Sequence, residues 1–185
     1  SFTRFGYVPT PHTIFKGINK LPPAHFVVIS DRGQSVSKPQ CYWDLASVAA
    51  TEAANTRKNP DPLSDELENL ILDAVGCRMV ADVPLGAFLS GGVDSTMVVA
   101  AMQAQSHQPV RTFSIGFDES EYNEADHAKV VANHLGTSHT ELYVTAHEAQ
   151  SVIPHLPIIY DEPFADSSQI PTFLVSKLAR QKVTV

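Results

Sequence analysis

The chain has 185 residues, of which 43% are hydrophobic and 18% are charged, and its 13 basic and 20 acidic side chains give a formal net charge of -7. This balance is typical of a globular domain with a real core, and it excludes a disordered chain. No run of Lys or Arg is longer than two residues. An acidic chain without a basic stripe is a poor partner for nucleic acid, so we expect no nucleic-acid binding.

Two cysteines, Cys41 and Cys77, lie far apart and form no Cys-x-x-Cys pattern. This favours ordinary thiols in a reducing compartment over a disulfide framework or a structural zinc site. No apolar run approaches the roughly 18 residues that a membrane-spanning helix needs, and the start of the chain shows no signal-peptide pattern. We therefore expect a cytoplasmic protein without a membrane partner.

Residues 1–44 have the pattern of β-structure and turns. His25 to Ser30 predicts a strand, Ser35 to Asp44 predicts its hairpin partner, and Asp31-Arg32-Gly33 has the chemistry of the turn between them. Residues 46–63 contain Ala, Thr, Asn and two prolines, which predicts a linker or a weakly ordered stretch. A short N-terminal β segment should therefore precede the rest of the fold.

From Ser64 onward the patterns of helices and strands alternate. Ser64 is a candidate helix cap, Asn123 is another, and Gly136 is a candidate helix end. We predict helices near residues 64–75, 94–105, 124–135, 145–155 and 168–181, and strands at 83–89, 110–117, 138–144 and from 183. This alternation predicts an α/β fold with a parallel, doubly wound sheet and helices on both faces. Ligands of such sheets bind at the carboxyl ends of the strands.

The segment from Leu89 to Thr96 joins a predicted strand to a predicted helix start. Gly91 and Gly92 can adopt backbone angles that are closed to other residues and let a ligand approach the main chain. Backbone N–H groups in such a turn form an anion nest, and the positive end of the helix dipole adds to it. The nearby hydroxyls add further donors, and they belong to Ser90, Ser95 and Thr96. The segment therefore predicts a pocket for phosphate oxygens.

Asp94 is the unusual residue of this segment, because a carboxylate repels phosphate unless a cation lies between them. Mg²⁺ favours one or two carboxylates together with phosphate oxygens, so Asp94 predicts magnesium bound through the phosphates. The segment is neither a Walker A loop nor a Gly-x-Gly-x-x-Gly turn. The alternative is a structural turn in which Asp94 only caps the helix.

Ser90 to Thr96, Ser-Gly-Gly-Val-Asp-Ser-Thr, resembles the pyrophosphate loop of the N-type ATP pyrophosphatases, which include several synthetases and tRNA-modifying enzymes. Other segments are similar to glutamine-dependent asparagine synthetases in particular. They are residues 82–92, 112–117, 131–139 and 161–168, and upstream residues 5–9, 14–18, 20–23 and 42–45. The resemblance implies the N-type ATP pyrophosphatase fold, with residues 1–45 as the tail of a glutaminase-like domain and its crossover, 46–63 as a linker, and 64–185 as the first part of the synthetase domain.

The resemblance implies that ATP and magnesium bind at the loop. The aspartate side-chain carboxylate would attack the α-phosphorus, pyrophosphate would leave, and ammonia from glutamine would displace AMP. The implied ATP-binding residues are Leu89, Ser90, Gly91, Gly92, Asp94, Ser95, Thr96, Ile115 and Gly116, with Asp94 also on the metal. The substrate-side candidates are Asp161, Glu162, Asp166 and Ser167. The family's directly catalytic groups would follow Val185, so we expect this stretch alone to be inactive.

Several alternatives stay open at this stage. An asparagine-synthetase-like amidotransferase could act on another carboxylate, in a polysaccharide or secondary-metabolite pathway, with an identical phosphate loop. A tRNA-modifying ATP pyrophosphatase and a non-catalytic nucleotide-binding module are candidates of other classes. A homodimer is also open. The expected partners are otherwise small molecules: ATP, aspartate and ammonia.

Overall fold

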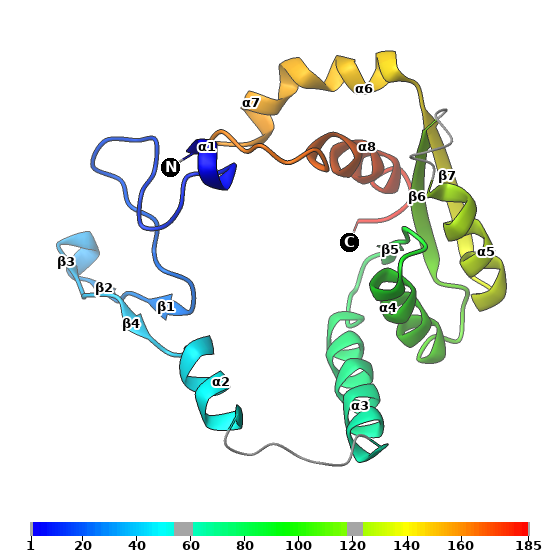
Figure 1. The fold of residues 1–185 in the computed structure, drawn as a ribbon, viewed down its shortest axis with the longest axis horizontal. Helices are drawn as coiled ribbons and strands as arrows, with labels where there is room; N and C mark the ends of the chain where they lie inside the picture. Colours follow the sequence, from blue (N-terminus) through cyan, green and yellow to red (C-terminus); the bar gives the residue numbers. More distant parts are fainter. Residues whose placement is uncertain (1, 54–60, 118–123, 185) are drawn as a thin grey trace. The chain divides into compact units, whose positions relative to one another are not determined.

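In the computed structural model, residues 2–53, 61–117 and 124–184 are described (Figure 1). The chain divides into two compact units. The N-terminal unit holds residues 1–59 together with 156–166, and the second unit holds residues 60–155 together with 167–185. The segment 156–166 therefore belongs by its contacts to a unit that is distant from it in sequence. Among the described residues, no helix is both long enough and apolar enough to cross a membrane.

The N-terminal unit contains two small antiparallel ladders. Strand β2 pairs with β3 and β1 pairs with β4, so the predicted hairpin is confirmed, and Arg32 in its turn has a left-handed φ of 55°. Its elements are α1 (Phe2–Phe5), β1 (His25–Phe26), β2 (Ile29–Ser30), η1 (Asp31–Gly33), β3 (Ser35–Val36), β4 (Gln40–Cys41), α2 (Leu45–Ala53) and α7 (Leu156–Ile159).

The described residues of the N-terminal unit form no buried core. None of its hydrophobic side chains whose exposure is described is buried, and Ile29, Tyr42 and Leu45 are all more than 60% exposed. Short strands with open edges cannot bury such side chains by themselves.

The predicted linker at 46–63 is more helical than expected, because its described residues, 46–53 and 61–63, all lie in helices, although the boundary between the two units falls within this range. Helix α2 covers Leu45–Ala53, and α3 already begins at Asp61 rather than at Ser64. The Asp44 carboxylate caps α2 by accepting hydrogen bonds from the backbone N–H of Ser47 at 2.8 Å and from its hydroxyl at 2.6 Å. Alanines favour the helix that follows this cap. A proline in the first turn of α3 is tolerated, since that N–H has no helical partner anyway.

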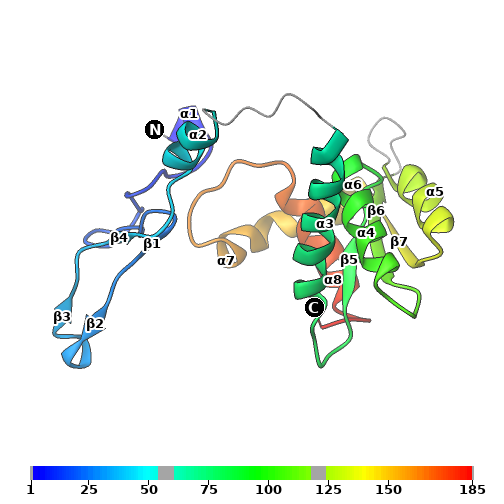
Figure 2. The ribbon, with the colours of Figure 1, turned by 90° about the horizontal axis from the view of Figure 1, so that it is seen from below.

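The second unit alternates helices and strands, as the sequence predicts. Its elements are α3 (Asp61–Arg78), β5 (Gly86–Phe88), α4 (Val93–Ala104), β6 (Arg111–Phe117), α5 (Ala125–Leu135), β7 (Ser138–Val144), α6 (Ala146–Val152), η3 (Ile153–His155) and α8 (Gln169–Ala179). Gly136 ends α5 with a left-handed φ of 71°, as predicted, whereas Asn123 lies outside the described residues. Helix α3 packs along α4, where the Gln105 side chain donates to the Leu72 carbonyl at 3.0 Å (Figure 2).

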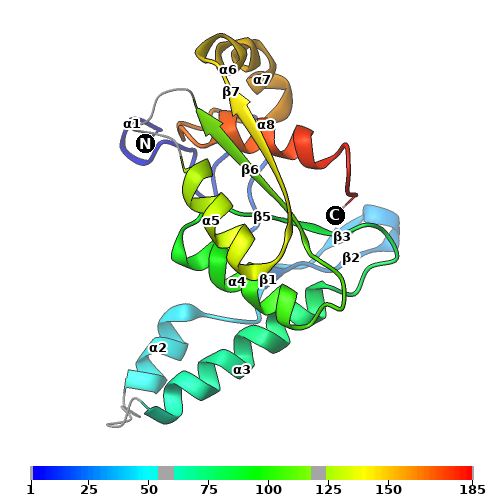
Figure 3. The same ribbon diagram turned by 90° about the vertical axis from the view of Figure 1, so that its right-hand side faces the viewer.

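The three strands form one parallel sheet in the order β5-β6-β7. Gly86 pairs with Arg111, and Arg111 in turn pairs with Ser138, so the amino ends of all three strands are aligned. Figure 3 shows the arrowheads of β6 and β7 at the same end of the sheet. Loops that leave the carboxyl ends of β5 and β6 therefore emerge at one edge, where ligands of such sheets bind.

Helices pack on both faces of this sheet (Figure 1). On one face, Leu89 and residues of α4 and α5 form a buried cluster, and on the other, Phe113 packs against α8. The first cluster consists of Leu89, Val99, Ala128 and Ala132, and the second of Phe113, Val175, Ala179 and Val183. The layered α/β arrangement is confirmed for these three strands.

The predicted strand from Val183 is not formed by the described residues. Val183 and Thr184 have no strand assignment, although the Thr184 N–H donates to the Pro84 carbonyl at 2.9 Å, just before β5. One such bond is too little to define a ladder. Val185 lies outside the described residues.

Two phenylalanines on neighbouring strands give the first testable prediction. Phe113 is 1% exposed and Phe88 is 49% exposed. We expect Phe113→Ala to lower the free energy of unfolding by about 3–5 kcal/mol, because it removes a buried ring and leaves a cavity. Phe88→Ala should cost at most about half as much. Urea unfolding followed by circular dichroism measures both, and equal losses would contradict the assignment of Phe113 to the core.

Candidate functional site

The predicted loop lies where the sequence places it, between the end of β5 at Phe88 and the start of α4 at Val93. Leu89 is 1% exposed, and its N–H donates to the Phe113 carbonyl on β6 at 2.9 Å. A buried side chain and a backbone bond thus fix the point from which the loop departs. The residues that follow, Ser90 to Gly92, are free of the sheet and stand at its carboxyl edge.

Two hydroxyl groups organise the interior of the loop. The Ser90 and Ser95 hydroxyl oxygens lie 2.9 Å apart, and the Ser90 N–H donates to the Ser95 hydroxyl at 3.2 Å. The Gly92 N–H donates to the Ser90 hydroxyl at 3.3 Å, and the Ser95 hydroxyl donates to the Gly92 carbonyl at 3.3 Å. Several of these contacts are long, and hydroxyl groups rotate, so the donors can be redirected to an incoming anion.

Two features of the loop require a glycine at position 91, namely its backbone angle and its close contact with α5. Its φ is 80°, a left-handed value that L side chains rarely adopt. A Cβ at this position would lie 2.7 Å from the Ala128 nitrogen and 2.8 Å from the His127 carbonyl carbon, both in the first turns of α5. The sequence suggested that this glycine admits a ligand, and the structure adds that it lets the loop lie directly against α5.

The start of α4 has no capping side chain. Gly92 is the N-cap residue, with φ -72° and ψ 163°, and because it has no side chain, no cap side chain accepts a hydrogen bond from the first turn of α4. The positive end of the helix dipole therefore faces an exposed turn. Ser90 and Gly92 are exposed, while Ser95 and Thr96 are partly buried. An accessible helix end without a side-chain cap, beside hydroxyls that can rotate toward a ligand, is suited to an anion.

Asp94 lies in the first turn of α4 but does not cap it, because the cap position is Gly92. The interpretation of Asp94 as a mere helix cap is therefore not supported. The side chain is exposed and makes no hydrogen bond or ion pair with the described residues. Within residues 2–53, 61–117 and 124–184, no group of three or more His, Cys, Asp or Glu side chains could hold a metal ion. A cation here would take Asp94 together with ligand oxygens, which fits magnesium.

Ile115 and Gly116 lie near the carboxyl end of β6, beside the strand that leads into the loop. Gly116 is buried, and the Ile115 side chain packs against the cluster under α8. Any contact of Ile115 with a ligand at the edge must therefore use its backbone. The structure thus brings Leu89 to Thr96 and these two residues to the same end of adjacent parallel strands.

The substrate-side candidates are not gathered in one unit. Asp161, Glu162 and Asp166 belong to the N-terminal unit, and Ser167 belongs to the second. Glu162 forms an ion pair with Lys20. The hydrogen bond from Lys20 lowers the pKa of the Glu162 carboxyl below its ordinary value, although partial burial opposes this shift. That these residues and the predicted phosphate loop contribute to one site stays a prediction.

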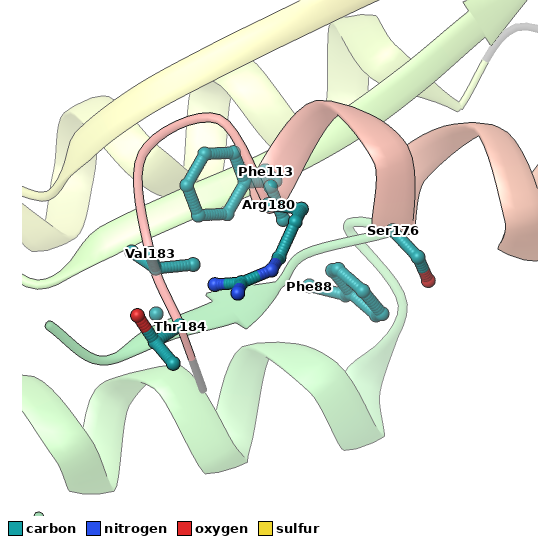
Figure 4. Close-up of a pocket in the computed structure, with 8 residues that line it drawn as sticks. Phe88, Phe113, Ser176, Arg180, Val183 and Thr184 are labelled. Carbon is teal, nitrogen blue, oxygen red and sulfur yellow. The ribbon is translucent and has the colours of Figure 1, made fainter. Parts of the chain in front are cut away.

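A cavity of about 350 Å³ opens beside β5 on the face covered by α8 (Figure 4). Phe88, Phe113 and Val183 supply its apolar walls, and Arg180 extends from the end of α8 across it. None of the predicted site residues lines this cavity. The cavity is mostly apolar, and Arg180 is the only charged residue among those that line it, so it suits packing better than the binding of phosphate.

Sequence reasoning missed a polar cluster under α5. His139 lies between two hydroxyls of β6, with Nδ1 2.9 Å from Thr112 Oγ1 and Nε2 3.1 Å from Ser114 Oγ. Its side chain is 9% exposed, and burial lowers the pKa of His139, an effect that Glu141 opposes and Lys129 reinforces. The alternation of Thr112 and Ser114 with apolar residues along β6 was the available signal, since it marks one face of the strand as polar.

His139 predicts a pH-dependent stability. A histidine whose pKa is lowered by folding binds fewer protons in the folded state than in the unfolded state, so its protonation favours unfolding. Its contribution is fully present above the ordinary pKa of 6.5 and is lost as the pH falls below that value. We expect the unfolding free energy of wild type to fall more steeply below pH 6.5 than that of His139→Gln. Urea unfolding from pH 8 to pH 5 measures both proteins. Unfolding free energies that change with pH by the same amount in wild type and His139→Gln would contradict this prediction.

The geometry of the loop predicts that alanine at position 91 lowers the free energy of unfolding much more than alanine at position 92. Gly91→Ala should destabilise the second unit by about 1–2 kcal/mol through the backbone angle alone, and the contact with Ala128 adds to this cost. Gly92→Ala is the control, because φ is -72° and the nearest atom to a new Cβ, Ser90 Oγ, is 3.4 Å away. It should cost less than about 1 kcal/mol. Similar small losses in urea unfolding would show that the loop is not held against α5.

Comparison with known proteins identifies the family. The family model "Asparagine synthase" matches residues 66–185. The chain is 38% identical over 181 residues to a putative glutamine-hydrolyzing asparagine synthetase 2 of Methanocaldococcus jannaschii, over 97% of this chain and 34% of that protein. It is 32% identical over 184 residues to asparagine synthetase 1 of Bacillus subtilis, over 100% of this chain and 28% of that protein.

A third relative has a different name. The amidase chyE of Penicillium rubens is 30% identical over 138 residues, which are 67% of this chain and 20% of that protein. The chain thus spans about a third or less of the length of these relatives. Because the family model covers well over half of the residues, the chain belongs to the asparagine synthase family.

Proposed function

We propose that this chain forms the nucleotide-binding part of a ligase that activates the side-chain carboxylate of aspartate with ATP, for amidation by ammonia derived from glutamine. The observation that carries the proposal is the exposed turn from Ser90 to Gly92, which joins an uncapped helix end to an unpaired carboxylate at Asp94. Donors suit phosphate oxygens and the carboxylate suits a cation, so together they suit magnesium pyrophosphate. Membership of the asparagine synthase family supports a ligase of this type.

In the proposed reaction, an aspartate carboxylate oxygen attacks the α-phosphorus of ATP. The bond from the α-phosphorus to the bridging oxygen breaks, pyrophosphate leaves and an acyl-adenylate forms. Ammonia then attacks the acyl carbon, loses a proton, and AMP leaves. The hydroxyls of Ser90, Ser95 and Thr96 and the N–H groups at the start of α4 stabilise the charge that develops on the leaving pyrophosphate. Magnesium, when bound, supplies charge neutralisation, and Asp94 is the residue that would hold it.

The remaining contacts are proposed on the same basis. Leu89, Ile115 and Gly116 would meet the adenine, mostly through backbone groups, since the Leu89 side chain is buried and that of Ile115 packs under α8. Asp161, Asp166 and Ser167 are proposed as substrate-side residues. We also propose the N-type ATP pyrophosphatase fold, which the β5–loop–α4 arrangement in a parallel sheet supports. The predicted homodimer and cytoplasmic location stay predictions.

A second candidate function differs only in the acceptor. Similarity to a protein named an amidase, over 67% of this chain, favours keeping another carboxylate substrate as the alternative to aspartate. The phosphate loop would work in the same way on either acceptor, because it contacts the leaving pyrophosphate and not the acyl group.

Asp94→Asn tests the proposed role of the loop in the intact polypeptide that contains this sequence. Pyrophosphate affinity measured by calorimetry with magnesium should fall by about tenfold or more, the scale of one lost interaction with a charged group. Without magnesium, affinity should stay the same or rise, since the variant removes a charge that repels the ligand. Asp73→Asn, an exposed carboxylate on α3, is the matched control and should change neither value.

Turnover gives the second measurement of the same experiment. Wild type should release pyrophosphate and form asparagine in equal amounts from ATP, aspartate and ammonia, and Asp94→Asn should lower both. Pyrophosphate release that requires a different carboxylate would favour the alternative acceptor. Equal losses of affinity with and without magnesium would show that Asp94 has only a structural role, and a wild type that releases no pyrophosphate would reject the ligase.

A further inference from the structure

The segment 156–166 connects two parts of the second unit but packs with the N-terminal unit. In chain order it follows η3, which ends at His155, and precedes Ser167 and α8. It carries Asp161, Glu162 and, at its end, Asp166, which are the acidic candidates for the substrate side. Because this segment is part of the N-terminal unit, its contacts within that unit determine how these acidic residues are held.

Glu162 makes the strongest of these contacts. One of its carboxylate oxygens, Oε2, pairs with the Lys20 ammonium, and the other, Oε1, accepts the Ile14 N–H at 3.0 Å. Lys20 is itself positioned, because its ammonium donates to the Val8 carbonyl at 2.5 Å and its backbone N–H donates to the Pro11 carbonyl at 2.9 Å. Both Glu162 oxygens are therefore used within the N-terminal unit.

A second contact joins the same two segments. The Ala165 N–H donates to the Gly6 carbonyl at 2.7 Å. Gly6 has a left-handed φ of 73°, and a Cβ there would lie 3.4 Å from the Ala165 carbonyl oxygen. A glycine at this position thus allows the backbones to approach closely. The acidic segment is held at two points, by the side chain of Glu162 and by the backbone of Ala165.

We propose that Lys20 and Glu162 form a positioning ion pair that holds the acidic segment 161–166, so that Glu162 fastens this segment and does not bind the substrate. The proposal rests on the proposed function for its kinetic consequence, since Asp161 and Asp166 are the residues that the pair would hold in place. It revises the sequence-based assignment of Glu162 to the substrate side. The hydrogen bond from Lys20 also lowers the pKa of the Glu162 carboxyl, as expected for two side chains that interact.

The surroundings of the pair favour a structural role over a chance surface contact. The Glu162 side chain is 17% exposed and that of Lys20 is 34% exposed, so solvent screens them less than a fully exposed pair. Both line a cavity of about 630 Å³ whose other walls include Tyr7, Phe15 and Phe164. Removing one partner of a partly buried pair leaves the other charge without compensation, which loosens the segment instead of merely weakening one bond.

Amide hydrogen exchange in the intact polypeptide tests the proposal directly. Lys20→Met removes the ammonium, and Glu162→Gln removes the charge while an amide oxygen can still accept the Ile14 N–H. Either variant should speed exchange at the Ala165 amide by about tenfold or more, because that bond joins the same segments. The exchanged pair, Lys20→Glu with Glu162→Lys, should recover part of the protection. Lys16→Met, an exposed lysine of the same N-terminal segment, is the control and should not alter it.

Kinetics separate positioning from direct binding. Lys20→Met and Glu162→Gln should each raise the KM for the carboxylate substrate by about tenfold, and leave the KM for ATP within about twofold, because misplacing the acidic segment affects only the acceptor. Loss of activity in Glu162→Gln alone, with Lys20→Met unchanged in both KM and exchange, would show that Glu162 binds substrate and would overturn the proposal. Should the wild type prove inactive, the proposed function fails. Unchanged exchange at Ala165 would still overturn the ion pair's role, and faster exchange would still support it.

Discussion

The candidate site depends on one close approach, in which the backbone of Gly91 lies against the first turns of α5. A Cβ at Gly91 would come within 2.7 Å of the Ala128 nitrogen, so the loop can take this path only with a glycine. The contact fixes the far side of a turn whose near side is already fixed by the Leu89 bond to Phe113. Because both sides of the turn are held, the start of α4 and the hydroxyl of Ser90 have fixed positions relative to each other.

The position of α5 in turn depends on the sheet beneath it. On β6 and β7, Thr112, Ser114 and His139 form a polar strip whose buried side-chain atoms all have hydrogen-bond partners. Buried polar groups specify one arrangement more strictly than apolar contacts do, because a displaced partner leaves a donor or acceptor unsatisfied. Thr137 links this strip to α5, because its hydroxyl lies 2.9 Å from Thr112 Oγ1 and donates to the Ala132 carbonyl at 3.4 Å. Gly91 lies against α5 in turn, so the path of the predicted phosphate loop depends in part on the core of β6 and β7.

Sequence reasoning succeeded where local pattern decides structure. The strand, turn and helix around Gly91 and Gly92 follow from a short apolar run, two glycines and a segment rich in Ala, Val and Met. All three are found, although β5 is shorter than the predicted strand at 83–89. It failed at α2, where a run read as a linker is helical because Asp44 caps it. It also could not find the contact of Gly91 with Ala128 on α5, or the ion pair of Glu162 with Lys20. The two residues of each contact are distant from each other in sequence. Such contacts depend on tertiary packing, which a single sequence does not display.

Asp94 and Glu162 show how two carboxylates of one predicted site come to differ. Asp94 stands exposed and unpaired at the positive end of α4, where a negative side chain is stabilised by the helix and remains available to a cation. Glu162 is partly buried and already carries a cation, Lys20, together with a backbone donor. A second positive ligand would gain little from a carboxylate whose charge is compensated. The same side-chain chemistry is therefore proposed to bind a cation at Asp94 and to hold a segment in place at Glu162, and the environment of each carboxylate determines the difference.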